Sequence, residues 1–334
     1  MIPSKQLLLQ ALALALASLL PFAASAQAPD PTPRLGILIP VGPPDYAILL
    51  EAFKPTHDET DGPFTFRAGT VAGIPVVYYI APTDGPLVRS LGAQAMLQHF
   101  NIKAFIYAGT SGGHLPPDQM SIGDIVLGAK NVDHGNYFLN RAGVIEPGSF
   151  NSIQKGMRHY GALYADPKLL SFLACSATRV AAHTETPSYL SPVDPAHHPQ
   201  VFFYGIQGTS TIWSDNLAYT KQTMDVFHEI DEDGDWYSNL VATLYHVPFI
   251  EVSIISNSIL GFPNADRGTP KAPDGEPNSH LLAQRLSNRI AVDLITHYGQ
   301  QMLTGTYTTP EDDPYPAIAY NNPTKPGDLL QDCK

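Results

Sequence analysis

The chain has 334 residues, and 31 Asp plus Glu stand against 19 Lys plus Arg, which gives a formal net charge of −12 at pH 7. An acidic protein without a basic cluster is poorly suited to the phosphate backbone of nucleic acid, so nucleic acid is not expected as a partner. No linker or repeat divides the sequence, and its length fits one large α/β domain.

The amino-terminal segment has the features of a signal peptide. Lys5 precedes an apolar run at residues 7–22, and Ala24-Ser25-Ala26 has the small-x-small pattern of a signal-peptidase site. The run is too short to favour a membrane anchor, and it contains no cysteine for a lipid. We therefore expect cleavage before Gln27 and export to the periplasm or the medium.

The organisation predicted for the chain is a signal peptide at 1–26, one domain at 27–303 and a Pro-rich irregular tail at 304–334. Cys175 and Cys333 are the two cysteines of the chain. Disulfides persist in exported proteins, so a bond between these two would pin the tail to the domain. Two free thiols are the alternative.

Apolar runs and helical periodicities alternate along the chain. Strands are predicted at 35–40, 64–67, 75–80, 104–108, 120–126, 201–206 and 249–255, and helices at 87–100, 215–227, 236–245 and 280–303. The strands at 64–67 and 75–80 are expected to form a hairpin-like pair, and an insertion is expected within 145–199. The alternation predicts a three-layer α/β/α sandwich with a mixed, largely parallel central sheet.

A glycine-rich turn is expected after the apolar strand at 104–108. It reads Gly109-Thr110-Ser111-Gly112-Gly113, at the carboxyl end of a strand covered on both faces. In open α/β sheets, ligands bind at that edge. Glycine allows close backbone approach, and the hydroxyls of Thr110 and Ser111 can hydrogen-bond. Thr110, Ser111 and Gly112 are therefore predicted to bind substrate.

Together with the strand Gly123-Asp124-Ile125-Val126, this turn resembles the nucleoside phosphorylase/hydrolase superfamily, and within it the methylthioadenosine/adenosylhomocysteine nucleosidases. The resemblance extends over residues 34–303. It implies cleavage of the N-glycosidic bond of a purine nucleoside without a cofactor, and a homodimer. No metal site is expected, because the adjacent His197 and His198 point different ways and no further ligand lies at suitable spacing.

The resemblance implies two acidic positions. Asp45 is the carboxylate nearest to the place of the family's catalytic, water-positioning acid, although it also suits a helix N-cap. Glu232 or Asp233 stands where the family has a Glu that grips the ribose hydroxyls, and the spacing to Val247-Pro248-Phe249 does not decide between them. An acidic helix start stabilised by the helix dipole is the alternative for this second segment.

Asn257 stands where the adenine-type nucleosidases have an Asp that protonates or binds N7 of the leaving purine. An amide cannot serve as a general acid, but its NH₂ group can donate a hydrogen bond to N7. The resemblance therefore implies either a preference for 6-oxopurines or a loss of activity. Trp213 or Tyr204 is expected to stack on the base.

Hydrolysis is favoured over phosphorolysis, because a phosphate co-substrate needs a cationic clamp and no Arg flanks the glycine turn. The turn at 81–89, which stands where the family has a Ser-Gly-Ile-Gly-Lys turn, offers Arg89 alone. The expected enzyme is a purine nucleosidase that passes through an oxocarbenium-like sugar. A nucleoside-binding or storage protein of the same fold is one alternative, and a phosphorylase or transport accessory protein is another.

Overall fold

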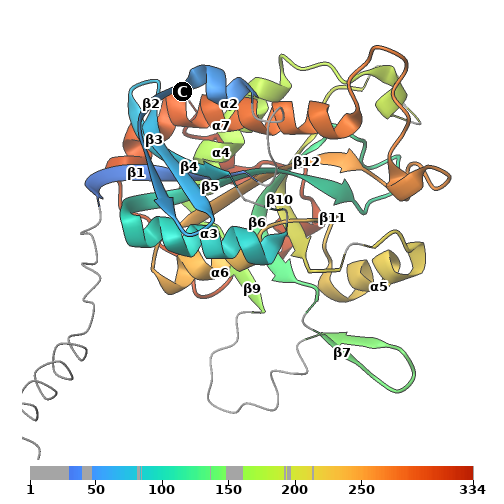
Figure 1. Cartoon of the computed structure of the whole chain (residues 1–334). Helices are drawn as coiled ribbons and strands as arrows, with labels where there is room; N and C mark the ends of the chain where they lie inside the picture. The colour runs from blue at the N-terminus through green and yellow to red at the C-terminus, as the bar shows by residue number, and fades with distance from the viewer. Residues whose placement is uncertain are drawn as a thin grey trace, which may run out of the picture.

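A computed structural model of the chain describes residues 30–39, 47–80, 83, 85–135, 137–147, 161–191, 193, 197–212 and 214–333. A twisted sheet lies between two helical layers (Figure 1). Helices α4 and α7 cover one face, and α3 and α6 cover the other. The predicted three-layer α/β/α sandwich is confirmed.

The central sheet is mixed, and its middle strands are mostly parallel. Its order is β11-β10-β6-β12-β5-β1-β4-β3-β2, with β9 paired to β6. β5 is parallel to both β1 and β12, whereas β12 and β6 are antiparallel. The strands are β1 Asp30–Ile39, β2 Phe53–Asp61, β3 Phe64–Val71, β4 Ile74–Ile80, β5 Phe100–Gly113, β6 Ile125–Asp133, β9 Ala162–Tyr164, β10 Val201–Thr209, β11 Asp231–Glu232 and β12 Phe249–Asn257. β7 (Tyr137–Leu139) and β8 (Ile145–Pro147) form a separate hairpin.

The helices that connect these strands are mostly short, apart from the closing helix. They are α2 Ala47–Ala52, α3 Pro86–His99, α4 Pro167–Ala181, α5 Leu217–Phe227, α6 Trp236–Leu244, α7 Ser279–Thr304 and α8 Ala317–Asn321. Single helical turns lie at Ser188–Leu190, Asp266–Gly268 and Gly327–Leu330. The predicted helices at 87–100, 215–227, 236–245 and 280–303 are confirmed as α3, α5, α6 and α7.

The glycine segment after residue 108 differs from its prediction. It was expected to turn, but β5 continues to Gly113. Gly112 and Gly113 pair with Glu232 and Asp231 of β11, so the backbone here has a strand partner that the apolar pattern did not indicate. The strand predicted at 120–126 also starts later than expected. Residues 121–124 form a turn, and β6 begins at Ile125.

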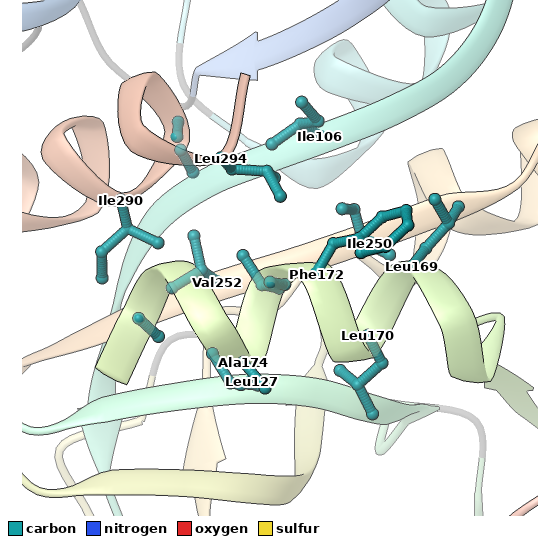
Figure 2. Packing of buried hydrophobic residues seen from close by; sticks show 14 of the residues in the cluster. Ile106, Leu127, Leu169, Leu170, Phe172, Ala174, Ile250, Val252, Ile290 and Leu294 are labelled. Atoms are coloured by element: carbon teal, nitrogen blue, oxygen red, sulfur yellow. The ribbon is translucent and has the colours of Figure 1, made fainter. Parts of the chain in front are cut away.

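Helix α4 lies inside the segment that was expected to be an insertion. Asp166 caps it by accepting hydrogen bonds from the backbone N–H groups of Lys168 and Leu169. Its buried face packs against β6, β12 and α7 (Figure 2). The helix itself was not predicted, because the Pro, Ser and His residues around it obscured one apolar helical run, and the insertion stays a prediction.

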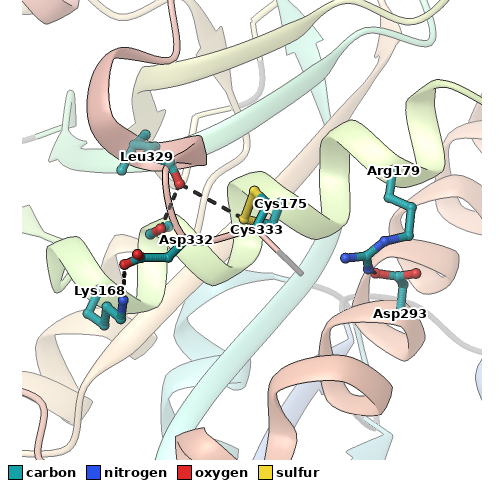
Figure 3. The surroundings of a disulfide bond; sticks show 8 residues. Lys168, Cys175, Arg179, Asp293, Leu329, Asp332 and Cys333 are labelled. Carbon is teal, nitrogen blue, oxygen red and sulfur yellow. Dashed lines mark hydrogen bonds and ion pairs between the residues drawn. A yellow bond between two sulfur atoms is a disulfide. The ribbon is translucent and has the colours of Figure 1, made fainter.

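The two cysteines form a disulfide, Cys175–Cys333, with their Cα atoms 5.3 Å apart (Figure 3). The tail therefore returns to α4, where the Leu329 carbonyl accepts a hydrogen bond from Ser171 Oγ at 2.6 Å. Lys168 pairs with Asp332 beside it. The predicted pairing is confirmed, and the alternative of free thiols was wrong.

In the described ranges, no helix is both long enough and apolar enough to span a membrane. Residues 1–26, where the signal peptide is predicted, lie outside those ranges.

Candidate functional site

Three segments that are distant in sequence meet at Gly112, near the carboxyl end of β5. Glu232 of β11 and Asn257 of β12 both stand opposite Gly112 in the strand register. A Cβ added at Gly112 would lie 3.1 Å from Asn257 Nδ2 and 3.3 Å from Glu232 Oε1. The glycine therefore lets a carboxylate and an amide approach the same point of the backbone.

Two pockets adjoin this point. The first has a volume of about 240 Å³ and is lined by Gly85, Pro86, His134, Ser210, Thr211, Ile212, Glu232 and Asp233. The second, of about 150 Å³, is lined by Ser214, Asp215, Asn257 and Arg267. Each is smaller than a typical small-molecule site, which has a volume of about 300–1,000 Å³.

Asp233 has a strained backbone at the first pocket. Its φ of 74° lies in the left-handed region, which non-glycine residues seldom adopt. The turn directs the chain from β11 into α6, and it leaves the Asp233 side chain 43% exposed. Such strain is often found at functional sites, where surrounding contacts hold it.

Arg89 is buried beside two acids under the pocket. Only 1% of its side chain is exposed, and its guanidinium lies 3.4 Å from Asp233 Oδ1 and 3.5 Å from Asp235 Oδ2. The same group sits 5.5 Å from the centre of the Tyr107 ring. Arg89, the one Arg of the turn at 81–89, is therefore paired with acids.

Two more buried carboxyls lie deeper in the sheet. Burial, followed by the nearby charges of Asp235 and Asp231, raises the pKa of Glu251 well above its ordinary value. Asn131 Nδ2 donates to it at 2.7 Å. Burial also raises the pKa of Asp231 to about 7, against the opposing hydrogen bonds from Ser111 and Gln207.

Two histidines complete the acidic region. His114, which follows β5, lies 3.4 Å from Glu229 Oε1 and 3.5 Å from Glu232 Oε2. His134, at the end of β6, contacts Glu229 through Nδ1 at 2.8 Å. Burial alone would lower the pKa of His114, but the two glutamates outweigh it and raise the pKa to about 10.

Thr110 and Ser111 lie at the predicted edge but face protein groups. Thr110 Oγ1 is 3.3 Å from His280 Nδ1, and Ser111 Oγ donates to Asp231 Oδ2 at 2.7 Å. In the described part of the chain, neither lines the two pockets. Gly112 shapes the site as backbone, and substrate binding by these three residues stays a prediction.

Asn257 is held from both sides of its amide. Nδ2 donates to the Arg267 carbonyl at 3.1 Å, and Oδ1 accepts from Ser256 Oγ at 3.1 Å. An NH₂ group has two hydrogens, so one is left for a ligand in the second pocket. Asp45 and Trp213 fall outside the described residues.

Tyr204 is not available to stack on a base. It packs on Tyr315 of the tail and donates to the Pro326 carbonyl at 3.1 Å. The expectation that it stacks was wrong, because the tail returns across β10. Within the described residues, no three His, Cys, Asp or Glu side chains are arranged to hold a metal ion.

The sequence-based prediction missed His114 and Glu229 as part of the site. Each stands next to a segment that was singled out, since His114 follows the glycine pair and Glu229 precedes the acidic run. Their proximity to each other arises from the pairing of β11 with β5, for which a two-residue strand gives no periodic signal.

No protein-family model and no curated protein matches the chain. Solved structures do. A methylthioadenosine/adenosylhomocysteine nucleosidase from Streptococcus pneumoniae, in complex with 8-aminoadenine, aligns with a TM-score of 0.56 at 14% identity, covering 79% of this chain and 99% of that one. Futalosine hydrolase of Helicobacter pylori aligns at 0.56 and 13% identity, covering 78% and 97%.

A putative methylthioadenosine nucleosidase from Weissella paramesenteroides aligns with a TM-score of 0.57 at 18% identity, covering 80% of this chain and 98% of that one. At such identities the likeness shows the fold and leaves the chemistry to the site. The chain therefore has the same three-layer fold as these nucleosidases and futalosine hydrolase.

Proposed function

We propose that the protein hydrolyses the N-glycosidic bond of a purine nucleoside, with a preference for 6-oxopurines, to give free base and ribose. The observation that carries the proposal is the convergence on Gly112 of Glu232, which lines the first pocket, and Asn257, which lines the second. The proposal is supported because a carboxylate that can accept from sugar hydroxyls lies beside an amide that can donate to a base, at the edge of the sheet where α/β proteins bind ligands.

Glu232 or Asp233 binds the ribose hydroxyls in this proposal. Hydrogen bonds from hydroxyls to a carboxylate are charge-assisted, and they strengthen as positive charge develops on the sugar. Glu232 is the better placed of the two, because it is buried and lies against Gly112, whereas Asp233 is 43% exposed and one of its oxygens lies 3.4 Å from Arg89.

Asn257 binds the base through its second amide hydrogen. Donation to N7 stabilises a departing purine without transferring a proton. Asp45 is proposed to polarise the attacking water, and Trp213 to stack on the base, as expected from the sequence. Arg267 and Asp215 line the same pocket as Asn257, so the base would meet polar groups there.

Phosphorolysis is less well supported. A phosphate in the first pocket would face the carboxylates of Glu232 and Asp233, and Arg89 beneath it is already paired with acids. Water is neutral and meets no such repulsion.

A binding or storage protein of the same fold is the second candidate, and Asn257 is the observation that favours it. An amide cannot supply the proton that a leaving adenine takes from a general acid. A chain that kept the acidic pocket but lost this proton donor would bind nucleosides and turn them over slowly.

The test is to incubate the chain from Gln27 onwards with inosine, guanosine, adenosine and methylthioadenosine, with and without phosphate, and to follow free base and sugar. Release of hypoxanthine or guanine with free ribose, independent of phosphate, is expected. Sugar phosphate as the product would favour the phosphorylase. Saturable nucleoside binding without turnover would favour the storage protein.

Export and dimerisation belong to the same proposal. Cell fractionation of the full chain is expected to find the protein, shortened before Gln27, outside the cytoplasm. Light scattering on that form is expected to give the mass of a dimer. Retention of residues 1–26 in the cytoplasm, or a monomeric mass, would contradict the respective part.

A further inference from the structure

Four ionisable side chains form a continuous line behind the first pocket. They run in the order His134, Glu229, His114, Glu232, and we call them the acid–histidine array. The successive distances are 2.8 Å, 3.4 Å and 3.5 Å. His134 and Glu232, at the two ends, line the pocket, whereas Glu229 and His114 are buried between them.

The inner pair of the array is an ion pair at neutral pH. Burial would raise the pKa of Glu229, but its contacts with His114 and His134 outweigh burial and lower it to about 2. The pKa of His114 is raised to about 10 by its two glutamates. The charge of Asp231, which also faces this region, interacts with both His114 and Glu229.

The ring of His134 has a defined orientation. Its Nδ1 faces the Glu229 carboxylate, so the proton lies on Nδ1 and Nε2 is the ring nitrogen left to meet a ligand. With its proton on Nδ1, the ring can accept a hydrogen bond from a hydroxyl through Nε2. Glu232, at the other end of the array, is also an acceptor.

Two glycines, which have no side chain, allow the array to lie close to the backbone. A Cβ at Gly208 would lie 2.2 Å from Glu229 Oε2 and 3.1 Å from His134 Nδ1. A Cβ at Gly112 would lie 3.3 Å from Glu232 Oε1. Burying ions costs free energy that hydrocarbon of the same volume would not, so an array kept at this cost points to a role beyond stability.

We propose that the acid–histidine array recognises the sugar of the ligand: Glu232 and His134 accept hydrogen bonds from its hydroxyls, and His114 and Glu229 are positioning residues that fix the two acceptors. The inference rests on the proposed function, because that function puts the ribose in the first pocket. It adds His134 to the ligand contacts and assigns two residues that do not touch the ligand.

The experiment crosses protein variants with a missing hydroxyl. Inosine and 2′-deoxyinosine are compared as substrates for the wild-type chain, His114→Gln, Glu229→Gln and the control His99→Gln. His99 also lies between two carboxylates, Glu59 and Asp61, but at the opposite end of β5. Thermal unfolding confirms that each variant is folded before it is compared.

The wild-type chain is expected to prefer inosine in kcat/KM by about 10- to 100-fold, which corresponds to one hydrogen bond to a charged group. His114→Gln and Glu229→Gln are expected to lose most of that preference, whereas His99→Gln keeps it. A merely structural role would lower kcat/KM equally for both substrates and leave the ratio of the two values unchanged. An unchanged ratio in both folded variants would overturn the proposal.

Calorimetric binding of the same two nucleosides separates this inference from the proposed function. Binding that prefers inosine, without turnover and with loss of the preference in His114→Gln, would sink the hydrolase and keep the array. Turnover of inosine, with the preference for inosine unchanged in the variants, would keep the hydrolase and overturn the role of the array. Absence of nucleoside binding to the wild-type chain would overturn both.

Ring-nitrogen NMR of the wild-type protein does not depend on any variant folding. Addition of inosine is expected to shift the Nε2 signal of His134, and addition of hypoxanthine alone is not. A His134 ring that responds to neither ligand would contradict the array.

Discussion

The two ends of β5 carry the same chemical arrangement in different surroundings. At the amino end, His99 lies 2.6 Å from Glu59 and 3.1 Å from Asp61, and 22% of its side chain is exposed. At the carboxyl end, His114 lies between Glu229 and Glu232 with 3% exposed. An exposed ion pair adds up to about 1 kcal/mol of stability. A buried one is costly to form and even more costly to break.

The two regions differ in how many buried ionisable side chains they contain. The face of the sheet under α4 and α7 is filled with hydrocarbon, as Figure 2 shows, and it needs no charges to be stable. The carboxyl edge collects buried carboxyls around one Arg and two His. Selection for stability alone would replace such groups with apolar side chains, so their presence supports the proposal that this edge binds the ligand.

The largest effect is expected from Glu232, where the array meets the pocket. Glu232→Gln removes the charge that stabilises the developing sugar cation, and we expect kcat/KM for inosine to fall by about 100-fold or more. Asp233→Asn is the matched control, one residue away and more exposed, and its loss is expected to be less than about tenfold. A larger loss in Asp233→Asn would assign the sugar contact to Asp233.

Removing the disulfide tests whether stability can be lowered on the α4 side of the sheet without changing activity at the first pocket. It closes a loop over a sequence separation of 158 residues on the α4 side, away from the residues that line the first pocket. Cys175→Ala with Cys333→Ala is expected to lower the free energy of unfolding by about 2–5 kcal/mol.

Nucleoside turnover by that double variant at 25 °C is expected to match the wild-type chain. Denaturant titration and steady-state rates measure the two quantities on one sample, and the reduced wild-type protein serves as control. A loss of turnover in the folded double variant would contradict the separation.

Asp231→Asn tests how the buried acid Asp231, near the carboxyl end of β5, changes the free energy of unfolding with pH. The pKa of Asp231 is about 7 in the folded chain and about 3.8 when unfolded, so the folded state holds more protons between these values. The stability of the wild-type chain therefore falls relative to Asp231→Asn as the pH rises from 4 to 7. Thermal midpoints across this range measure the trend, and parallel curves for the two proteins would show that Asp231 titrates normally.

Much of the fold was predictable because it follows local periodicity. The strands at 104–108 and 249–255 are continuous apolar runs, and α7 has a long helical repeat. β2 was missed because its sequence is polar and exposed on the sheet edge. α4 was missed because the irregular composition on either side outweighed its single apolar face.

The site was predictable only in part. Glu232 and Asn257 could be identified through the resemblance. Glu232 precedes the predicted helix at 236–245, and Asn257 follows the predicted strand at 249–255. Their meeting at Gly112 depends on β11, a two-residue strand whose pairing is decided by tertiary contacts. His114 and Glu229 acquire their roles from that pairing, and no spacing in the sequence indicates that they lie within 3.4 Å of each other.

The smallest effect is expected from His99, at the exposed end. Its neighbours Glu59 and Asp61 outweigh burial and raise its pKa above the ordinary value of 6.5. The stabilisation is therefore fully present below about pH 6.5 and is lost as the pH rises through the folded pKa. His99→Gln is expected to cost about 1 kcal/mol or less at pH 6, with a smaller cost at pH 9. The ring of His99 also stacks on Phe66, and losing that contact lowers stability equally at every pH. Chemical unfolding at both pH values separates the two contributions, and turnover of inosine stays at the wild-type rate. A large loss of turnover in His99→Gln would mean that the two ends of β5 are coupled, which would break the contrast between them.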